Sequence, residues 1–127
     1  MLRALDNPVY SDRGQVYDNL GHCMRSKGDL GAAEKYYRSA LQIDPTMQGP
    51  LLEMAKLSYD QKNYISARAF LQRYHAVAPD SPVSLWLGIR IERILGDQNA
   101  LASYELSLKN QFPNSEQTRL YLESIKQ

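Results

Sequence analysis

Apolar and small residues recur three and four places apart along this chain, which is the spacing of one face of an α-helix. In residues 14–47, Ala33, Tyr37 and Ala40 stand at i, i+4 and i+7 and therefore share a face. The Gly-Asp pair at 28–29 interrupts this pattern, because glycine can end one helix in a left-handed conformation and aspartate can cap the next. The stretch therefore predicts two antiparallel helices joined by a tight turn.

The same arrangement returns every 34 residues, as the spacing of Pro45, Pro79 and Pro113 indicates. Proline cannot continue a helix, so each of these residues marks the end of a helix pair. The first unit resembles a tetratricopeptide repeat (TPR), and the residues that carry the resemblance are Leu20-Gly21, Gly28-Asp29, Ala33, Tyr37, Ala40 and Pro45. We predict an all-α TPR solenoid of antiparallel helix pairs, wound into a right-handed superhelix. Its three repeats are expected at 14–47, 48–81 and 82–115.

Two repeats depart from this pattern. In the second, Lys62-Asn63 replaces Gly-Asp, and we expect the asparagine to accept the left-handed turn. In the third, Leu87-Gly88, Ala100 and Tyr104 stand one place earlier than a strict period requires. We interpret this unit as a true repeat whose interior register slips by one residue.

The beginning of the chain does not fit a complete repeat. Residues 1–8 resemble the end of a second TPR helix, so we interpret them as the remainder of a truncated repeat. The unpaired apolar residues of this remainder would allow self-association. The alternative to a truncated repeat is a short native N-terminal cap. Residues 9–13 are then expected to form a join, in which Ser11 or Asp12 caps the following helix.

The end of the chain predicts a capping helix. Residues 116–127 carry many charges, and Ser115 is placed to cap their first turn. We expect Leu120, Leu122 and Ile125 to form the single apolar face that packs on the solenoid. The whole chain is thus expected to form one domain.

Composition narrows the possible functions. Lys and Arg number 15 against 14 Asp and Glu, a formal net charge of +1, so the overall charge does not point to nucleic acid or to an anionic membrane. No apolar run approaches the roughly 18–20 residues of a membrane helix. The N-terminus lacks the apolar segment of a signal peptide.

Catalysis has little support in this sequence. Cys23 is the single cysteine, and its neighbour His22 points about 100° away on a helix, so the two do not form a nucleophile–base pair. We expect Cys23 to be a small buried residue. His75 lies in another repeat, so no metal site is predicted, and no phosphate-binding loop is present. We therefore predict no enzyme, no catalytic residue and no cofactor.

The first helices of a TPR solenoid line a groove that holds peptides or helices of other proteins. Helical spacing selects the candidate groove residues Asn19, His22, Leu52, Lys56, Tyr59, Trp86, Arg90 and Arg93, with Gln15, Asp18, Arg25 and Glu53 beside them. Two interpretations stay open for Trp86, which either lines the groove or packs in the core against the second repeat. The two arginines either meet an acidic segment of a partner or are solvated surface.

One known type of groove grips the acidic C-terminus of heat-shock proteins with lysine and asparagine side chains. Of the corresponding positions here, only Asn19 fits, because Glu53, Val83 and Leu87 stand at others. A chaperone-binding groove of that type is therefore disfavoured.

Three segments carry a more specific resemblance. They are Asn7-Pro8-Val9-Tyr10, the Asn-Leu-Gly-x-Cys of 19–23, and Leu85-Trp86-Leu87-Gly88-Ile89-Arg90. These segments are similar to the type IV pilus biogenesis lipoproteins, the PilF/PilW-type pilotins. The chain resembles the C-terminal part of such a protein.

The resemblance implies a non-catalytic scaffold that helps the type IV pilus secretin reach the outer membrane and multimerise there. It implies a parent protein at the periplasmic face of the outer membrane, held only by a lipidated N-terminal cysteine, with this chain as a soluble fragment. Cys23 does not match that cysteine, because it lies inside a predicted helix. Two alternatives stay open: a general TPR adaptor that binds a peptide or helix of another assembly, and an enzyme built on His22 and Cys23.

Overall fold

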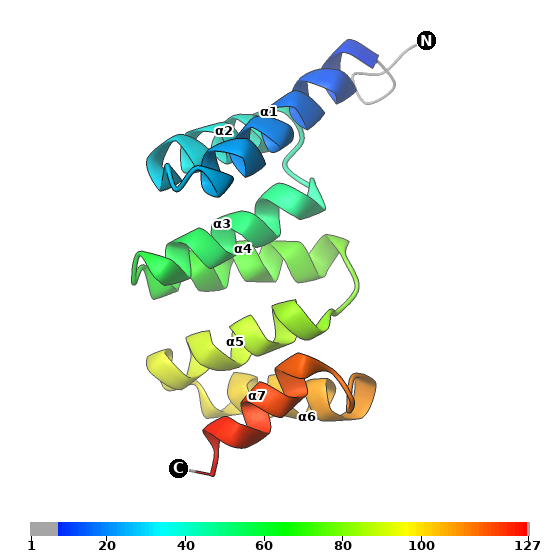
Figure 1. The fold of residues 1–127 in the computed structure, drawn as a ribbon. Coiled ribbons are helices and arrows are strands. Elements are labelled where there is room, and N and C mark those ends of the chain that lie inside the picture. The colour runs from blue at the N-terminus through cyan, green and yellow to red at the C-terminus, as the bar shows by residue number, and fades with distance from the viewer. Residues whose placement is uncertain (1–7, 127) are drawn as a thin grey trace.

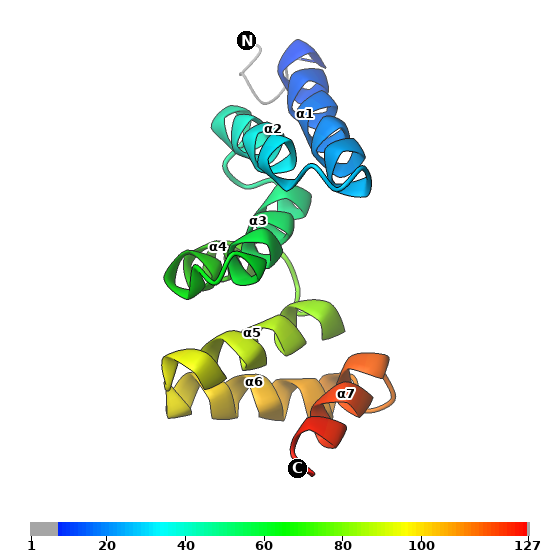
Figure 2. The same cartoon turned by 60° about the vertical axis from the view of Figure 1, so that its left-hand side comes forward.

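The computed structural model describes residues 8–126, which form seven α-helices and contain no strand. The helices are α1 (Pro8–Ser26), α2 (Leu30–Ile43), α3 (Gln48–Asp60), α4 (Tyr64–Val77), α5 (Pro82–Leu95), α6 (Gln98–Gln111) and α7 (Glu116–Ser124). Helices α1 and α2, α3 and α4, and α5 and α6 form antiparallel pairs that stack one after another (Figures 1 and 2). Consecutive pairs meet through α2 with α3 and α4 with α5, and α7 packs on α5. The predicted solenoid of helix pairs is confirmed.

The second helix of each pair begins at a strict interval. Helices α2, α4 and α6 start 34 residues apart. The side chains of Asp29, Asn63 and Asp97 each accept a hydrogen bond from the backbone N–H three residues later and so cap these helices. The residue before the cap has positive φ in all three turns, at 82° for Gly28 and 64° for Lys62. The left-handed residue of the second repeat is therefore the lysine, and the expectation for Asn63 was wrong.

Small residues let the paired helices approach closely. At Gly21 the ring of Tyr37 lies directly against the glycine, and at Gly88 the ring of Tyr104 does the same. Both tyrosines stand 16 residues after their glycine, although α6 keeps the strict period. The structure thus confirms the internal slip of the third repeat: the glycine and its tyrosine move together by one residue.

The hydrophobic core has two parts. The larger cluster joins the first two pairs to α5 and includes Tyr37, Leu51, Met54, Leu71 and Leu87. The smaller cluster joins α5, α6 and α7 through Leu85, Ile89, Leu108 and Tyr121.

Helix α1 begins earlier than predicted. It starts at Pro8, where the missing proline N–H has no intrahelical acceptor to lose. Residues 9–13 are therefore helical and form no join, and Ser11 and Asp12 lie inside the helix instead of capping it. The proposed remainder of a truncated repeat, with its open apolar residues, falls mostly on residues 1–7, outside the part that the structure describes.

The capping helix is present but is turned differently from the prediction. Ser115 caps α7 by accepting the Thr118 N–H, as expected. However, Leu120, Leu122 and Ile125 are exposed, and Thr118 and Tyr121 face inward instead. The cause is the preceding turn, because the Thr118 hydroxyl donates to the carbonyl of Phe112 at 2.6 Å and fixes the rotation of the helix. The predicted apolar face of α7 was wrong.

Candidate partner-binding surface

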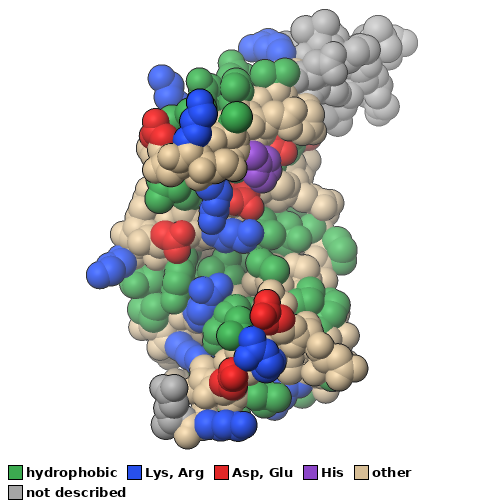
Figure 3. Space-filling model, viewed as in Figure 1, with side chains coloured by type: hydrophobic (Ala, Val, Ile, Leu, Met, Phe, Trp, Pro, Cys, Tyr) green, Lys and Arg blue, Asp and Glu red, His purple; other side chains and the backbone are tan. Residues whose placement is uncertain are grey.

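The first helices of the pairs, α1, α3 and α5, together form what we call the first-helix face. Figure 3, in the view of Figure 1, shows basic side chains spaced down the middle of the molecule among hydrophobic ones. At the α1–α3 junction, Glu53 accepts from Arg25 at 2.6 Å and from Lys56 at 3.2 Å. One carboxylate thus faces two cations. Burial raises the pKa of nearby Asp18; His22 opposes this rise, and the negative charge of Glu53 adds to it.

Arginine and aromatic side chains alternate from α3 to α7, and we call this series the arginine–aromatic stack. The Arg90 guanidinium carbon lies 5.0 Å from the ring centroid of Tyr59 and 5.2 Å from that of Trp86. The Arg93 guanidinium carbon lies 5.7 Å from the Trp86 ring and 5.6 Å from the Tyr121 ring. Each guanidinium therefore lies near two aromatic rings, at distances where cation–π attraction acts.

A pocket of about 160 Å³ connects Arg25 and Lys56, the two cations that share Glu53, to the arginine–aromatic stack. It is lined by Arg25, Lys56, Tyr59, Asp60, Val83, Leu87 and Arg90. These residues come from α1, α3 and α5, so the pocket exists only because three successive first helices lie side by side. Five of the eight candidate groove residues are thus brought together by the pocket and the stack: Lys56, Tyr59, Trp86, Arg90 and Arg93.

The other three candidates lie elsewhere or face inward. Asn19 is exposed on α1 and accepts a hydrogen bond from Gln15. The Nδ1 of His22 lies 3.2 Å from the Tyr37 hydroxyl, whose pKa burial raises to about 12. Leu52 packs on the larger core cluster. None of these three residues lines the pocket of about 160 Å³ that borders the arginine–aromatic stack.

Trp86 combines parts of both interpretations that the sequence left open. Its ring is half-buried and packs on the smaller core cluster, meeting the Tyr121 ring edge-on at a centroid distance of 6.5 Å. The ring therefore leans toward α7, away from the second repeat, while one side stays open to the two arginines. Tyr121 was missed by sequence reasoning, because α7 was expected to be a solvated cap with other residues inward.

The sequence hypothesis of a His22–Cys23 catalytic pair finds no geometric support. Cys23 is exposed, which corrects the expectation that it is buried. The ring nitrogens of His22 face the Tyr37 hydroxyl and, at 3.3 Å, the Asp18 carboxylate. Across residues 8–126, no group of three His, Cys, Asp or Glu side chains is placed to hold a metal ion.

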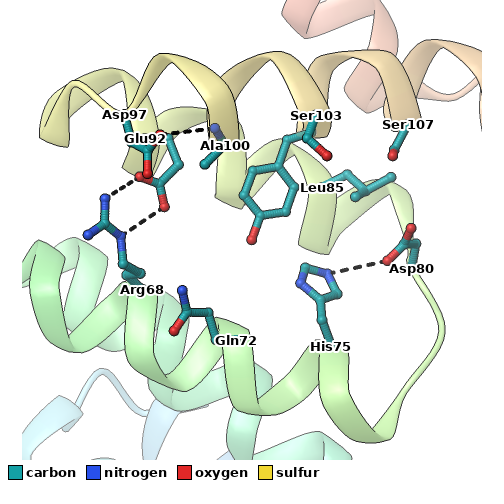
Figure 4. Close-up of a pocket in the computed structure, with 11 residues that line it drawn as sticks. Arg68, Gln72, His75, Asp80, Leu85, Glu92, Asp97, Ala100, Ser103 and Ser107 are labelled. Carbon is teal, nitrogen blue, oxygen red and sulfur yellow. Dashed lines mark hydrogen bonds and ion pairs between the residues drawn. The ribbon is translucent and has the colours of Figure 1, made fainter.

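A larger pocket, of about 390 Å³, opens between α4 and α6 (Figure 4). Arg68 reaches from α4 to Glu92 on α5 with two hydrogen bonds, one of them 3.0 Å from Nε to Oε2. Burial lowers the pKa of His75, and the charge of Asp80 opposes this shift. This pocket was not expected from the sequence, and its polar groups come from α4, α5, α6 and the two turns that join these helices.

His75 and Asp80 of this pocket meet the buried Ser84 beside it, but their geometry is not that of a catalytic triad. The Ser84 hydroxyl and the Asp80 carboxylate both approach the same nitrogen, Nε2 of His75, at 2.9 and 3.8 Å. A triad needs them on opposite nitrogens. Ser84 is also fully buried and forms a capping box with Ser81 at the start of α5. These contacts stabilise the α4–α5 turn.

The stacked helix pairs and their 34-residue pattern define a TPR domain, and residues 24–85 match the tetratricopeptide repeat family. Over 115 residues the chain is 30% identical to the type IV pilus assembly protein PilF of Pseudomonas aeruginosa, covering 91% of this chain and 46% of that protein. The chain thus spans about half the length of this relative. None of the helices within residues 8–126 combines the length and apolarity needed to cross a membrane.

Solved structures agree with this relationship. A structure of Pseudomonas aeruginosa PilF matches with a TM-score of 0.84 and 27% identity, covering 95% of this chain and 56% of that one. PilW, described as a widely conserved type IV pilus biogenesis factor, matches with a TM-score of 0.77 and 28% identity over 93% and 54%. The N-terminal domain of C. elegans stress-induced protein 1 shares the fold at a TM-score of 0.72 and 16% identity, covering 90% and 95%. The chain therefore has the TPR fold and is similar to type IV pilus biogenesis factors.

Proposed function

We propose that this domain is a non-catalytic scaffold of type IV pilus assembly that binds a partner protein on its first-helix face. The arginine–aromatic stack carries the proposal, because it presents tryptophan, tyrosine and arginine side chains at the junction of three helices. Residues of these types supply most of the binding energy at protein interfaces. The similarity to PilF and PilW supports the pilus context.

The partner in this proposal is the type IV pilus secretin, and the role is that of a pilotin that assists secretin localisation and multimerisation. The protein would act at the periplasmic face of the outer membrane, held there by a lipid anchor. This part extends the resemblance of the sequence to the pilotins. A protein with such a role needs a binding surface and no reaction centre.

Binding to secretin purified from the same organism tests the proposal. The protein is immobilised, and bound secretin is measured for the unaltered protein, for Trp86→Ala with Arg90→Ala, and for Arg73→Ala. Arg73 is a matched control, because it also stacks on an aromatic ring, Phe70, but lies on α4. We expect loss of binding in the double variant alone, with circular dichroism confirming that it is folded.

Two outcomes would contradict the proposal in different ways. If the unaltered protein does not bind secretin, the pilotin role fails and a general TPR adaptor becomes the better interpretation. If the folded double variant binds as well as the unaltered protein, the first-helix face is not the binding surface.

A further inference from the structure

The charges on the first-helix face do not balance, although those of the chain nearly do. The pocket and the stack together hold Arg25, Lys56, Arg90 and Arg93. Three carboxylates accompany them: Glu53 beside the pocket, Asp60 in its lining, and Glu105, which accepts a hydrogen bond from the Tyr121 hydroxyl of the stack. Because Glu53 is already shared by Arg25 and Lys56, the local excess of positive charge falls on the two stacked arginines.

Both stacked arginines have hydrogen-bond donors to spare. No carboxylate of residues 13–126, where side chains are described, lies within ion-pairing distance of either one. Arg90 makes one long hydrogen bond, of 3.5 Å, to the Trp86 carbonyl, and Arg93 donates one bond to the Ser124 hydroxyl at 2.9 Å. A guanidinium carries five N–H donors, so most of them stay available in the plane of each group.

Stacking prepares these donors for a planar acceptor. Attraction to two nearby rings limits the positions that each guanidinium can take, while its N–H edge keeps most of its donors available. A carboxylate accepts two parallel hydrogen bonds from such an edge, and the bonds are strengthened by the opposite charges. Arg90 and Arg93 lie against the same indole ring, so neighbouring acidic side chains of one segment can reach both.

We propose that the arginine–aromatic stack recognises an acidic segment of the partner protein, whose carboxylates pair with Arg90 and Arg93 while its apolar side chains contact Tyr59 and Trp86. This inference rests on the proposed function only in taking the first-helix face as the surface that binds protein. A protein segment fits better than a nucleic acid, because Glu53 and Asp60 would repel a continuous phosphate backbone beside the stack.

Trp86 provides a direct measurement, since it is the single tryptophan of the chain and forms part of the stack. The probe is a short peptide of glutamate, serine and leucine without aromatic residues, and the matched peptide has glutamine in place of every glutamate. Each peptide is titrated into the protein while the Trp86 fluorescence is recorded at low and at high salt. A single-stranded oligothymidine serves as a third probe.

We expect the glutamate peptide to bind at least about tenfold more tightly than the glutamine peptide at low salt, and to lose this advantage at high salt. Arg90→Gln with Arg93→Gln should remove the difference between the peptides. Arg93→Gln alone should reduce it, and because Arg93 is exposed this variant keeps its fold. Arg73→Gln, at the stacked arginine on α4, should leave it unchanged.

Equal binding of the two peptides would overturn the inference, as would an undiminished preference in the double variant. Tighter binding of oligothymidine than of the glutamate peptide would also overturn it, in favour of nucleic acid. Failure of this inference is distinguishable from failure of the proposed function. Secretin that binds without any dependence on Arg90 and Arg93 contradicts only the acidic segment, whereas glutamate-dependent peptide binding without secretin binding contradicts only the secretin role.

Discussion

Replacing Gly21 with alanine tests whether close helix contact holds the first pair together. A Cβ at this position would lie 2.5 Å from Cε1, 2.7 Å from Cδ1 and 2.8 Å from Cζ of the Tyr37 ring. Real Cβ atoms do not approach other heavy atoms this closely, so the ring or the helix must move. Tyr37 has no exposed surface, and its hydroxyl bonds to His22 at 3.2 Å, so the ring has no free space to enter.

The size of the expected change in unfolding free energy follows from three contributions. Overpacking of a dense core costs about 1–3 kcal/mol, and alanine in place of glycine inside a helix returns up to about 1 kcal/mol. Losing the Tyr37–His22 hydrogen bond as the ring shifts costs about 1 kcal/mol more. We therefore expect Gly21→Ala to lower the free energy of unfolding by about 1–3 kcal/mol.

Gly31 is a matched control on the partner helix. A Cβ at Gly31 would meet nothing closer than Asp29 Oδ1 at 3.9 Å, so Gly31→Ala should stabilise the protein by up to about 1 kcal/mol. Urea unfolding followed by circular dichroism measures both variants, with the slope of the transition compared first, because stacked repeats can unfold in stages. If Gly21→Ala shifts the midpoint upward as Gly31→Ala does, the argument from close contact is refuted.

Four further variants probe the α4–α6 side. Gly88→Ala should cost less than Gly21→Ala in the same urea assay, because the Tyr104 ring borders the large pocket and has space to move; an equal or larger cost would contradict this. Arg68→Met should cost about 3 kcal/mol, and more than Glu92→Gln, because it leaves a carboxylate that is 4% exposed without its partner, whereas the arginine is 29% exposed; the reverse order in urea would refute the argument. Burial lowers the pKa of His75 below its ordinary value of 6.5, so the unfolded chain binds the proton first and stability falls as the pH drops below about 6.5. His75→Gln should flatten that decline in melts recorded across this range, and an unchanged slope would assign the decline to other groups.

Features fixed by local sequence were predictable. Helix starts depend on a cap residue and the N–H three places later, so the 34-residue spacing of the turns at 28–29, 62–63 and 96–97 was enough to place α2, α4 and α6, although Asn63 was predicted as the left-handed residue. The slip in the third repeat was visible for the same reason, because Gly88 and Tyr104 keep the separation of the first glycine–tyrosine pair. Within α5, helical spacing also placed Trp86, Arg90 and Arg93 on one side.

Features fixed by the rotation of a helix against its neighbours were not predictable. Gly21 faces Tyr37, so Cys23, two residues and about 200° further round α1, points away from α2 into solvent. The contribution of Tyr121 to the stack has a similar origin. It depends on how α7 is turned, and one hydrogen bond from Thr118 to the Phe112 carbonyl sets that rotation. Periodicity alone preferred the leucines of α7, which the structure leaves exposed.

The two pockets both border the junction between the second and third helix pairs. On one side, the Arg68–Glu92 ion pair ties α4 to α5. On the other side, Tyr59 of α3 contacts Arg90 of α5 at 5.0 Å, so the arginine–aromatic stack spans the same junction. Because α3 and α4 pack on each other, both contacts join the same helix pair to α5. The Arg68–Glu92 pair of the polar pocket thus has a structural role, in which each group neutralises the other. The stacked arginines have no such partner and are the groups left for recognition.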